Sequence, residues 1–134
     1  MGLVELYEKE RLRIAETADG RGDYSHPVFG EGPVNPLVML IGEAPGGDEA
    51  KQGRPFVGKA GKQLDALLSG AGIDRSRVYI TNAVKFRPVN VKPKSVSNRT
   101  PTGAEMKSGM PLLKNELCLL SPRNASASTV LETW

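Results

Sequence analysis

The chain has 134 residues, of which 39% are hydrophobic and only 5% aromatic, so it is long enough for one domain with a mostly aliphatic core. Its apolar runs are all shorter than the roughly 18 residues that span a membrane, and its charged N-terminus lacks the apolar stretch of a secretory signal. We therefore expect a cytoplasmic protein with no membrane partner.

The first half of the chain predicts a helix, a strand and a second helix. Residues 3–17 are rich in charged side chains and carry apolar residues at helical spacing, which predicts an amphipathic helix. Residues 18–36 are rich in Gly, Asp, Pro and Asn, which predicts an extended connection. The continuous apolar run 37–41 predicts a strand buried on both faces. A long glycine-rich loop follows at 42–58, and leucines on one face of residues 59–69 predict the next helix.

Residues 77–84 predict a second strand, and a strand–helix–strand unit of this size implies parallel pairing with a right-handed crossover. Residues 85–101 contain three prolines, lack an apolar period and predict a loop. This loop has no Asp or Glu, so it can attract a polyanion or can simply be solvated. Its basic residues are Lys85, Arg87, Lys92, Lys94 and Arg99.

The last third of the chain predicts one helix and an unusual tail. Thr102 and Glu105 have the spacing of a capping box, which predicts a helix that continues to about residue 120. Pro111 lies inside this helix and should kink it or divide it in two. The tail 121–134 is small and polar and does not supply the further apolar strand that an α/β domain needs here.

Cysteine and histidine are scarce. The single cysteine, Cys118, excludes an intrachain disulfide and a cluster of thiolate ligands, and its apolar neighbours predict a buried side chain rather than a nucleophile. The single histidine, His26, excludes a histidine-rich metal site.

The first loop and the end of the second strand carry the residues that point to a site, because open α/β sheets bind ligands outside the carboxyl ends of their strands. Neither a P-loop nor the dinucleotide fingerprint follows the first strand. Instead Glu43 and Glu49 flank a glycine turn, Phe56 follows, and Asn82 ends the second strand. An amide suits the polar edge of a nucleobase, an aromatic ring suits its face, and a carboxylate can orient water toward a sugar carbon. The presence of these side chains at one edge of the sheet predicts a nucleobase pocket.

Together, these motifs resemble the uracil-DNA glycosylase superfamily, most closely its family 4. The similarity covers roughly residues 37–120, with GEAPG at 42–46, GRPFVGKAG at 53–61, VYITNAVK at 78–85, and then Arg87-Pro88, Asn98-Arg99, Pro101-Thr102 and Glu105. The resemblance implies a three-layer α/β fold, an open sheet with central parallel strands. It also implies a DNA repair enzyme of base excision, a hydrolase that cuts the N-glycosidic bond of a flipped uracil in DNA.

The resemblance also implies roles for single residues. Phe56 would stack on the base, although it could be a plain core residue, and Asn82 would read the polar edge of uracil. Glu49 would place the catalytic water, with Glu43 as the alternative. Arg54 would contact a DNA phosphate or form a salt bridge within its loop. The expected uracil-binding residues are Gly42, Glu43, Ala44, Phe56 and Asn82, and the expected DNA-binding residues are Arg54, Lys85, Arg87, Lys92, Lys94 and Arg99.

The sequence departs from family 4 in three places. That family holds a four-iron, four-sulfur cluster with four cysteines, whereas here the N-terminal pair is absent and Phe86 and Gly109 stand at the other two positions. We therefore expect no cluster, no metal and no cofactor. The loop 88–98 is longer, and either lies along DNA or is a disordered insertion. The late histidine motif is missing, so we expect a domain over residues 1–120 that is incomplete at its C-terminus, and an atypical tail at 121–134.

Three functions stay open at this point. The first is a glycosylase that releases uracil, and the second is a degenerate, non-catalytic nucleic-acid-binding relative that lacks the late histidine motif. The third is a related enzyme that acts on another base or on a nucleoside. The expected partner is DNA containing uracil, and we expect the protein to be a monomer.

Overall fold

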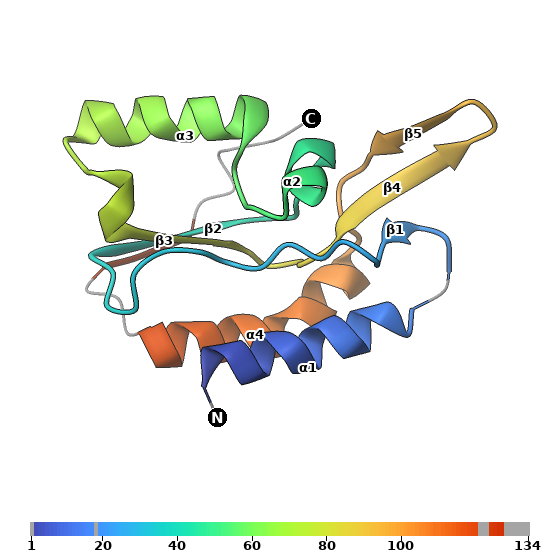
Figure 1. Cartoon of the computed structure of the whole chain (residues 1–134), viewed down its shortest axis with the longest axis horizontal. Coiled ribbons are helices and arrows are strands. Elements are labelled where there is room, and N and C mark those ends of the chain that lie inside the picture. Colours follow the sequence, from blue (N-terminus) through green and yellow to red (C-terminus); the bar gives the residue numbers. More distant parts are fainter. Residues whose placement is uncertain (1, 18, 121–123, 128–134) are drawn as a thin grey trace.

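Over the residues that the structure describes, three parallel strands form the central sheet, and helices cover both of its faces (Figure 1). The computed structural model describes residues 2–17, 19–120 and 124–127. In spatial order, the strands of the central sheet are β3 (Val78–Asn82), β2 (Val38–Gly42) and β6 (Asn124–Ala127). The two strands predicted from apolar runs are thus present and pair in parallel, as expected.

The helices form the two outer layers. Figure 1 shows α2 and α3 on one face of the sheet, and α1 and α4 side by side on the other. Their bounds are α1 Leu3–Ala15, α2 Gly47–Gln52, α3 Gly58–Ala71 and α4 Gly103–Leu120. This arrangement confirms the predicted three-layer α/β fold. Within the described residues, no helix is long and apolar enough to cross a membrane.

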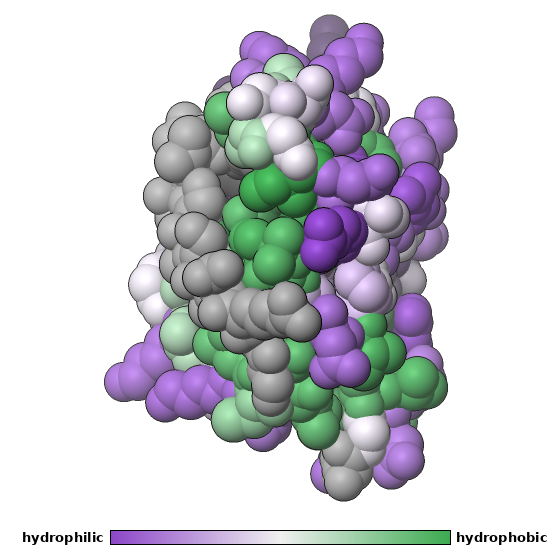
Figure 2. All heavy atoms as spheres, turned by 90° about the vertical axis from the view of Figure 1, so that its left-hand side faces the viewer, coloured by the Kyte–Doolittle hydropathy of each residue, from purple (hydrophilic) through white to green (hydrophobic). Residues whose placement is uncertain are grey.

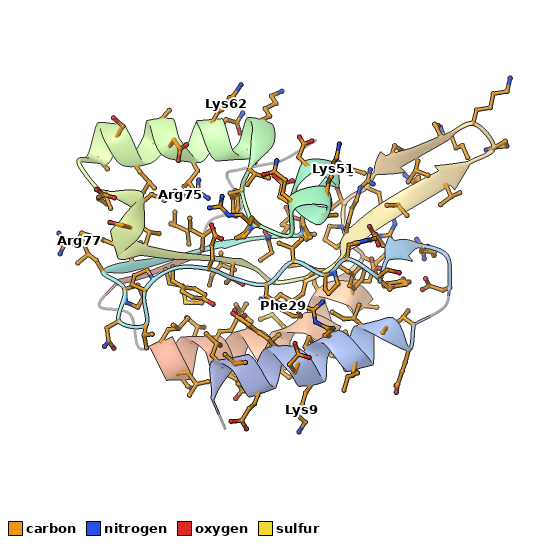
Figure 3. All side chains as sticks on the ribbon, in the orientation of Figure 1. Lys9, Phe29, Lys51, Lys62, Arg75 and Arg77 are labelled. Atoms are coloured by element: carbon orange, nitrogen blue, oxygen red, sulfur yellow. The ribbon has the colours of Figure 1, made fainter. Side chains whose placement is uncertain are left out.

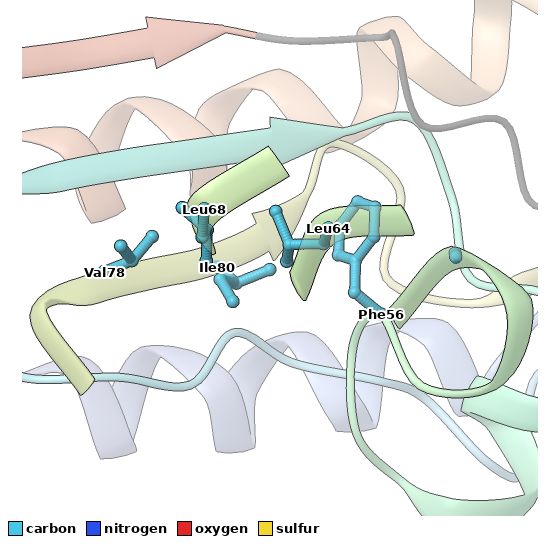
Figure 4. Packing of buried hydrophobic residues seen from close by; sticks show 6 residues of the cluster. Phe56, Leu64, Leu68, Val78 and Ile80 are labelled. Carbon is cyan, nitrogen blue, oxygen red and sulfur yellow. The ribbon is translucent and has the colours of Figure 1, made fainter. Parts of the chain in front are cut away.

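Aliphatic side chains fill the space on each side of the sheet, as the composition predicts. The cluster under α3 consists of Phe56, Ala60, Leu64, Leu68, Val78 and Ile80 (Figure 4). The cluster toward α4 consists of Met39, Tyr79, Ala83, Leu113 and Leu120. Burial of apolar surface, at about 25 cal/mol per Å², is the main force that holds such layers together.

Apolar side chains also reach the surface on one side of the molecule. Figure 2 shows them gathered on the side that is left in Figure 1, where the parallel strands begin. The carboxyl ends of the strands lie at the opposite edge, next to α2 (Figure 1). The candidate site described below is at that carboxyl edge.

Residues 85–101 are not the plain loop that their prolines predicted. β4 (Arg87–Lys92) pairs with β5 (Ser95–Asn98) across a two-residue turn, and its other edge pairs with β1 (Gly22–Asp23). The segment is therefore an antiparallel hairpin rather than a disordered insertion. Its pairing with β1 joins positions far apart in the sequence, so local composition does not reveal it.

Other expectations are also corrected by the structure. The loop 42–58 contains the short helix α2. Pro111 does not divide α4, which is one helix from Gly103 to Leu120, and the alternative of a kink at this proline stays a prediction. Cys118 is exposed rather than buried. Residues 124–127 of the tail form β6, which pairs in parallel with β2, so the expectation that this segment supplies no strand was wrong. The domain boundary placed at residue 120 stays a prediction.

The capping box that was predicted at the start of α4 is confirmed. The Thr102 hydroxyl accepts a hydrogen bond from the Glu105 backbone N–H at 3.1 Å, and the Glu105 carboxylate accepts one from the Thr102 N–H at 2.9 Å. Arg99 forms an ion pair with the same carboxylate at 2.6 Å. The Arg99 guanidinium is the main reason why the pKa of Glu105 lies below its usual range.

Replacing Glu105 by glutamine should destabilise the protein in a way that depends on pH. A carboxyl group whose pKa is lower in the folded state contributes stability above its unfolded pKa, and this stability is lost as the pH falls through the folded value. We expect Glu105→Gln to lower the free energy of unfolding at pH 7 by about 1–3 kcal/mol. The difference from the wild type should shrink below pH 4.5, the ordinary pKa of a glutamate.

Urea denaturation between pH 7 and pH 3 measures this difference, with the exposed Glu5→Gln as the control. A difference that stays constant over the whole range would contradict the role given to the ion pair.

Candidate functional site

The strands β2 and β3 end together and are joined beyond their last residues. Their register places Gly42 opposite Asn82. The Ala83 N–H then donates to the Gly42 carbonyl at 2.9 Å, and the Val84 N–H donates to the Glu43 carbonyl at 2.9 Å. The loop after β2 is therefore held to the chain after β3, and both strand ends form one rim.

Gly42 lets two predicted site residues approach each other over this rim. A Cβ at this position would lie 2.6 Å from the Phe56 Cζ and would also meet the Asn82 side-chain oxygen. Only a glycine leaves room for the ring edge and the amide together. The structure thus brings Gly42, Phe56 and Asn82 together, as the sequence predicted, although Phe56 is 3% exposed and also belongs to the core under α3.

Phe56 has a backbone conformation that side chains rarely adopt. Its φ is 52°, in the left-handed region, which costs about 1–3 kcal/mol in a residue other than glycine. Arg75 holds this turn, since its guanidinium donates to the Pro55 carbonyl at 3.2 Å and to the Phe56 carbonyl at 3.1 Å (Figure 3). No local pattern indicates this role, because Arg75 comes after α3 and meets the loop only in the folded chain.

The Glu49 side chain joins the two ends of the loop between β2 and α3. Its carboxylate is buried, and it accepts hydrogen bonds from the Gly46 N–H at 3.1 Å and the Val57 N–H at 3.0 Å. Burial raises the pKa of Glu49, while these backbone donors lower it. Each carboxylate oxygen keeps a lone pair that could hold water. Glu43 is half-buried at the same rim.

Three of the expected DNA-binding residues form ion pairs within the chain, two of them with little exposure and Arg54 at the surface. Lys85 is buried and its ammonium lies 2.5 Å from the Glu116 carboxylate. Arg99 is held by Glu105, and Arg54 forms two hydrogen bonds to Glu31, of 2.8 and 3.0 Å. Lys85 and Arg99 could meet a phosphate only by breaking partly or fully buried ion pairs, so the structure does not place them at a DNA surface.

The other three expected cations lie on or near the hairpin. Arg87 donates to the Asn98 side chain at 2.6 Å and lies beside Gly47 at the start of α2. Lys92 and Lys94 are exposed at the end of the hairpin. These residues leave a cationic path beside the rim.

Sequence reasoning missed two adjoining grooves beside α2, found among the described residues, which extend this path and share His26 and Lys51. One has a volume of about 400 Å³ and is lined by Arg11, His26 and Lys51 among others. The other, of about 380 Å³, is lined by His26, Lys51 and Arg87, together with Asp23. Arg11 also lies 5.2 Å from the Phe29 ring centroid (Figure 3 labels Phe29). No local pattern connects residues from α1, the β1 region and α2, so only the fold reveals these grooves.

The positions that correspond to the cluster cysteines of family 4 do not fit an iron–sulfur cluster. Phe86 packs edge-on against Tyr24, with ring centroids 4.9 Å apart. Gly109 packs directly against the Ala83 carbonyl, which leaves no room for a larger side chain. Neither place offers a thiolate. In the part of the chain that the structure describes, no three His, Cys, Asp or Glu side chains gather as metal ligands.

The fold is that of an α/β protein, and its candidate ligand site lies at the carboxyl edge of a parallel sheet, where such proteins bind their ligands. A family model described as the uracil DNA glycosylase superfamily matches residues 29–127, and the chain belongs to this superfamily. The resemblance seen in the sequence is thereby confirmed.

Three relatives, each named "Type-4 uracil-DNA glycosylase", are similar to the chain. The protein of Pyrobaculum aerophilum is 45% identical over 100 residues, which are 75% of this chain and 47% of the relative. That of Thermotoga maritima is 43% identical over 120 residues (90% and 58%), and that of Sulfurisphaera tokodaii is 40% identical over 100 residues (74% and 42%). The chain spans about half the length of these curated relatives.

A methyl group at position 42 should disturb the rim. We expect Gly42→Ala to push the Asn82 amide and the Phe56 ring apart and to lower the free energy of unfolding by about 1–3 kcal/mol. Urea denaturation measures the loss. The matched control is Gly70→Ala in α3, where an added Cβ meets nothing within 4 Å and alanine favours the helix. Equal stability of Gly42→Ala and wild type would show that the rim is not closely packed.

Proposed function

We propose that the protein binds uracil flipped out of DNA and hydrolyses the bond between the base and deoxyribose. The observation that carries this proposal is the convergence of Gly42, Phe56 and Asn82 at the carboxyl edge of the sheet. Membership of the superfamily and the names of the relatives support the same function.

In this proposal the rim reads the base. The Asn82 amide has both a donor and an acceptor, which match the neighbouring carbonyl and N–H groups of uracil. The backbone of Gly42, Glu43 and Ala44 lines the pocket, and the Phe56 ring provides the stacking surface. Because that ring is 3% exposed, stacking requires a neighbouring group to move.

The attacking water is placed by a carboxylate in this proposal. Glu49 is our first candidate, since its buried carboxyl has a raised pKa that suits a general base better than an ordinary glutamate. Glu43 is the alternative, because it lies half-buried directly after Gly42.

DNA approaches along the cationic path of the hairpin and the α2 grooves. Phosphates would meet Arg87 and the exposed Lys92 and Lys94 on one side, and Lys51 on the other. Arg54 can join them while it stays paired with Glu31, because its exposed guanidinium has N–H donors that this pair does not use. The cytoplasmic location and the monomeric state stay predictions.

Release of uracil tests the proposal directly. The chain is incubated with single-stranded and duplex oligonucleotides that carry one uracil, and alkali then cleaves the abasic sites. We expect faster release opposite guanine than opposite adenine, because a mismatched base flips at lower cost. Asn82→Ala should slow release about 10- to 100-fold, which corresponds to the loss of one buried hydrogen-bonding group.

The matched control is Asn90→Ala, at an exposed position of β4. Retained DNA binding without release by the wild type would instead indicate a non-catalytic relative. In the same assay, Glu49→Gln and Glu43→Gln identify the carboxylate that places water, provided that both variants melt near the wild-type temperature.

The DNA path is tested by reversing one charge. Lys51→Glu should weaken binding to any DNA sequence and reduce the slope of log affinity against log salt by about 1. Lys9→Glu is the control, because Lys9 lies on the outer side of α1, far from Lys51 (Figure 3). Equal effects of both substitutions in a fluorescence-anisotropy titration would show that only net charge matters.

A further inference from the structure

A buried network of polar side chains lies directly behind the rim, and the mechanism above does not use it. Its members come from α1, from β3 and the residues after it, and from α4. They are Tyr7, Tyr79, Thr81, Lys85 and Glu116. The side chains of Lys85 and Glu116 are only 2% and 0% exposed. A buried ion pair of this kind costs desolvation energy, so a contribution to stability does not by itself explain its presence.

The Lys85 ammonium is fully satisfied by three acceptors. It lies 2.5 Å from the Glu116 carboxylate and 2.8 Å from the Thr81 hydroxyl, and it also donates to the Asn82 carbonyl. Burial lowers the pKa of Lys85, and Glu116 opposes this shift. The contact with the Asn82 carbonyl links the network to the candidate site.

The peptide group between Asn82 and Ala83 is therefore held on both sides. Its N–H donates to the Gly42 carbonyl at 2.9 Å, and its carbonyl accepts from Lys85. Because a peptide group is planar, these two bonds fix its orientation and hence the ψ angle of Asn82. That angle helps to set the direction in which the Asn82 side chain leaves the strand.

The network also reaches α1, which lies outside the residues matched by the family model. The Tyr7 hydroxyl donates to Glu116 at 2.5 Å and lies 2.6 Å from the Tyr79 hydroxyl. Burial raises the pKa of both tyrosines, that of Tyr79 to about 12, so both hydroxyls stay protonated. The Tyr7 ring stacks on Phe29, with centroids 4.7 Å apart, which anchors α1 to the chain before β2.

We propose that Lys85 and Glu116 are positioning residues that aim the Asn82 side chain at the base, and that Tyr7 of α1 keeps Glu116 in place. The proposal rests on the proposed function for the role of Asn82 as the base reader. The position of the Asn82 side chain, however, can be measured without any catalysis.

The main test replaces the ion pair by apolar side chains of similar length, as Lys85→Met with Glu116→Leu. Such replacements often preserve stability, so the melting temperature should stay near that of the wild type. The side-chain amide signal of Asn82 in a ¹⁵N–¹H NMR spectrum, identified by its loss in Asn82→Ala, should shift and broaden. In the uracil assay kcat should fall about 10- to 100-fold with a smaller change in KM, as for a displaced reacting group.

A milder pair of variants covers the case in which the double variant does not fold. Tyr7→Phe removes the hydroxyl from Glu116 but keeps the ring on Phe29, so the Asn82 amide signal should shift in the same direction by less. The matched control is Tyr24→Phe, whose hydroxyl bonds Asp19 outside the network, and it should leave that signal unchanged.

The outcomes separate the two proposals. If the wild type releases no uracil but the Asn82 signal responds as expected, the proposed function fails and the positioning role stands. If the folded double variant keeps the wild-type Asn82 signal and kcat, the positioning role is wrong. If the double variant does not fold, an unchanged Asn82 signal in Tyr7→Phe overturns it.

Discussion

The parallel pairing of β2 with β3 brings the residues of the rim together. The register that sets Gly42 opposite Asn82 also brings the glycine loop beside the chain after β3. Successive residues of a strand point to opposite faces, so a slip of one residue would turn Asn82 away from Phe56. The apolar clusters on both faces prevent such a slip, because they bury alternate residues of β3 under α3 and against α4. The same pairing of β2 with β3 therefore sets both the packing of the core and the geometry of the candidate site.

Three of the six cations expected to bind DNA are paired with carboxylates of the same chain. Lys85, Arg99 and Arg54 each hold a carboxylate from another part of the chain. These pairs connect α4 to the chain after β3, the end of β5 to α4, and the loop before α3 to the segment before β2. The expected DNA-binding surface is therefore smaller than the sequence suggests, and the cations that remain beside the rim come from α2 and the hairpin.

The features that could be predicted from the sequence have local signals. The apolar run before Gly42, the leucine face of α3 and the Thr102–Glu105 capping box each fit within a few residues. The meeting of Gly42, Phe56 and Asn82 also followed, because parallel strands end at a common edge.

The features that could not be predicted depend on distant partners. Lys85 looked like a free cation because Glu116, which neutralises it, comes 31 residues later. β6 has a polar composition, and only its backbone pairing with β2 makes it a strand. Cys118 follows an apolar pattern but lies on the side of α4 away from the buried Leu113, Glu116 and Leu120. In each case the fold, rather than the neighbouring sequence, decides the environment.

One carboxylate, that of Glu49, receives hydrogen bonds from both ends of the loop that contains α2. The Gly46 and Val57 amides, eleven positions apart in the chain, therefore depend on a single side chain for their protection from solvent. Amide hydrogen exchange at these two positions should then proceed through one shared opening event, and the loop would open as a unit rather than fray from either end.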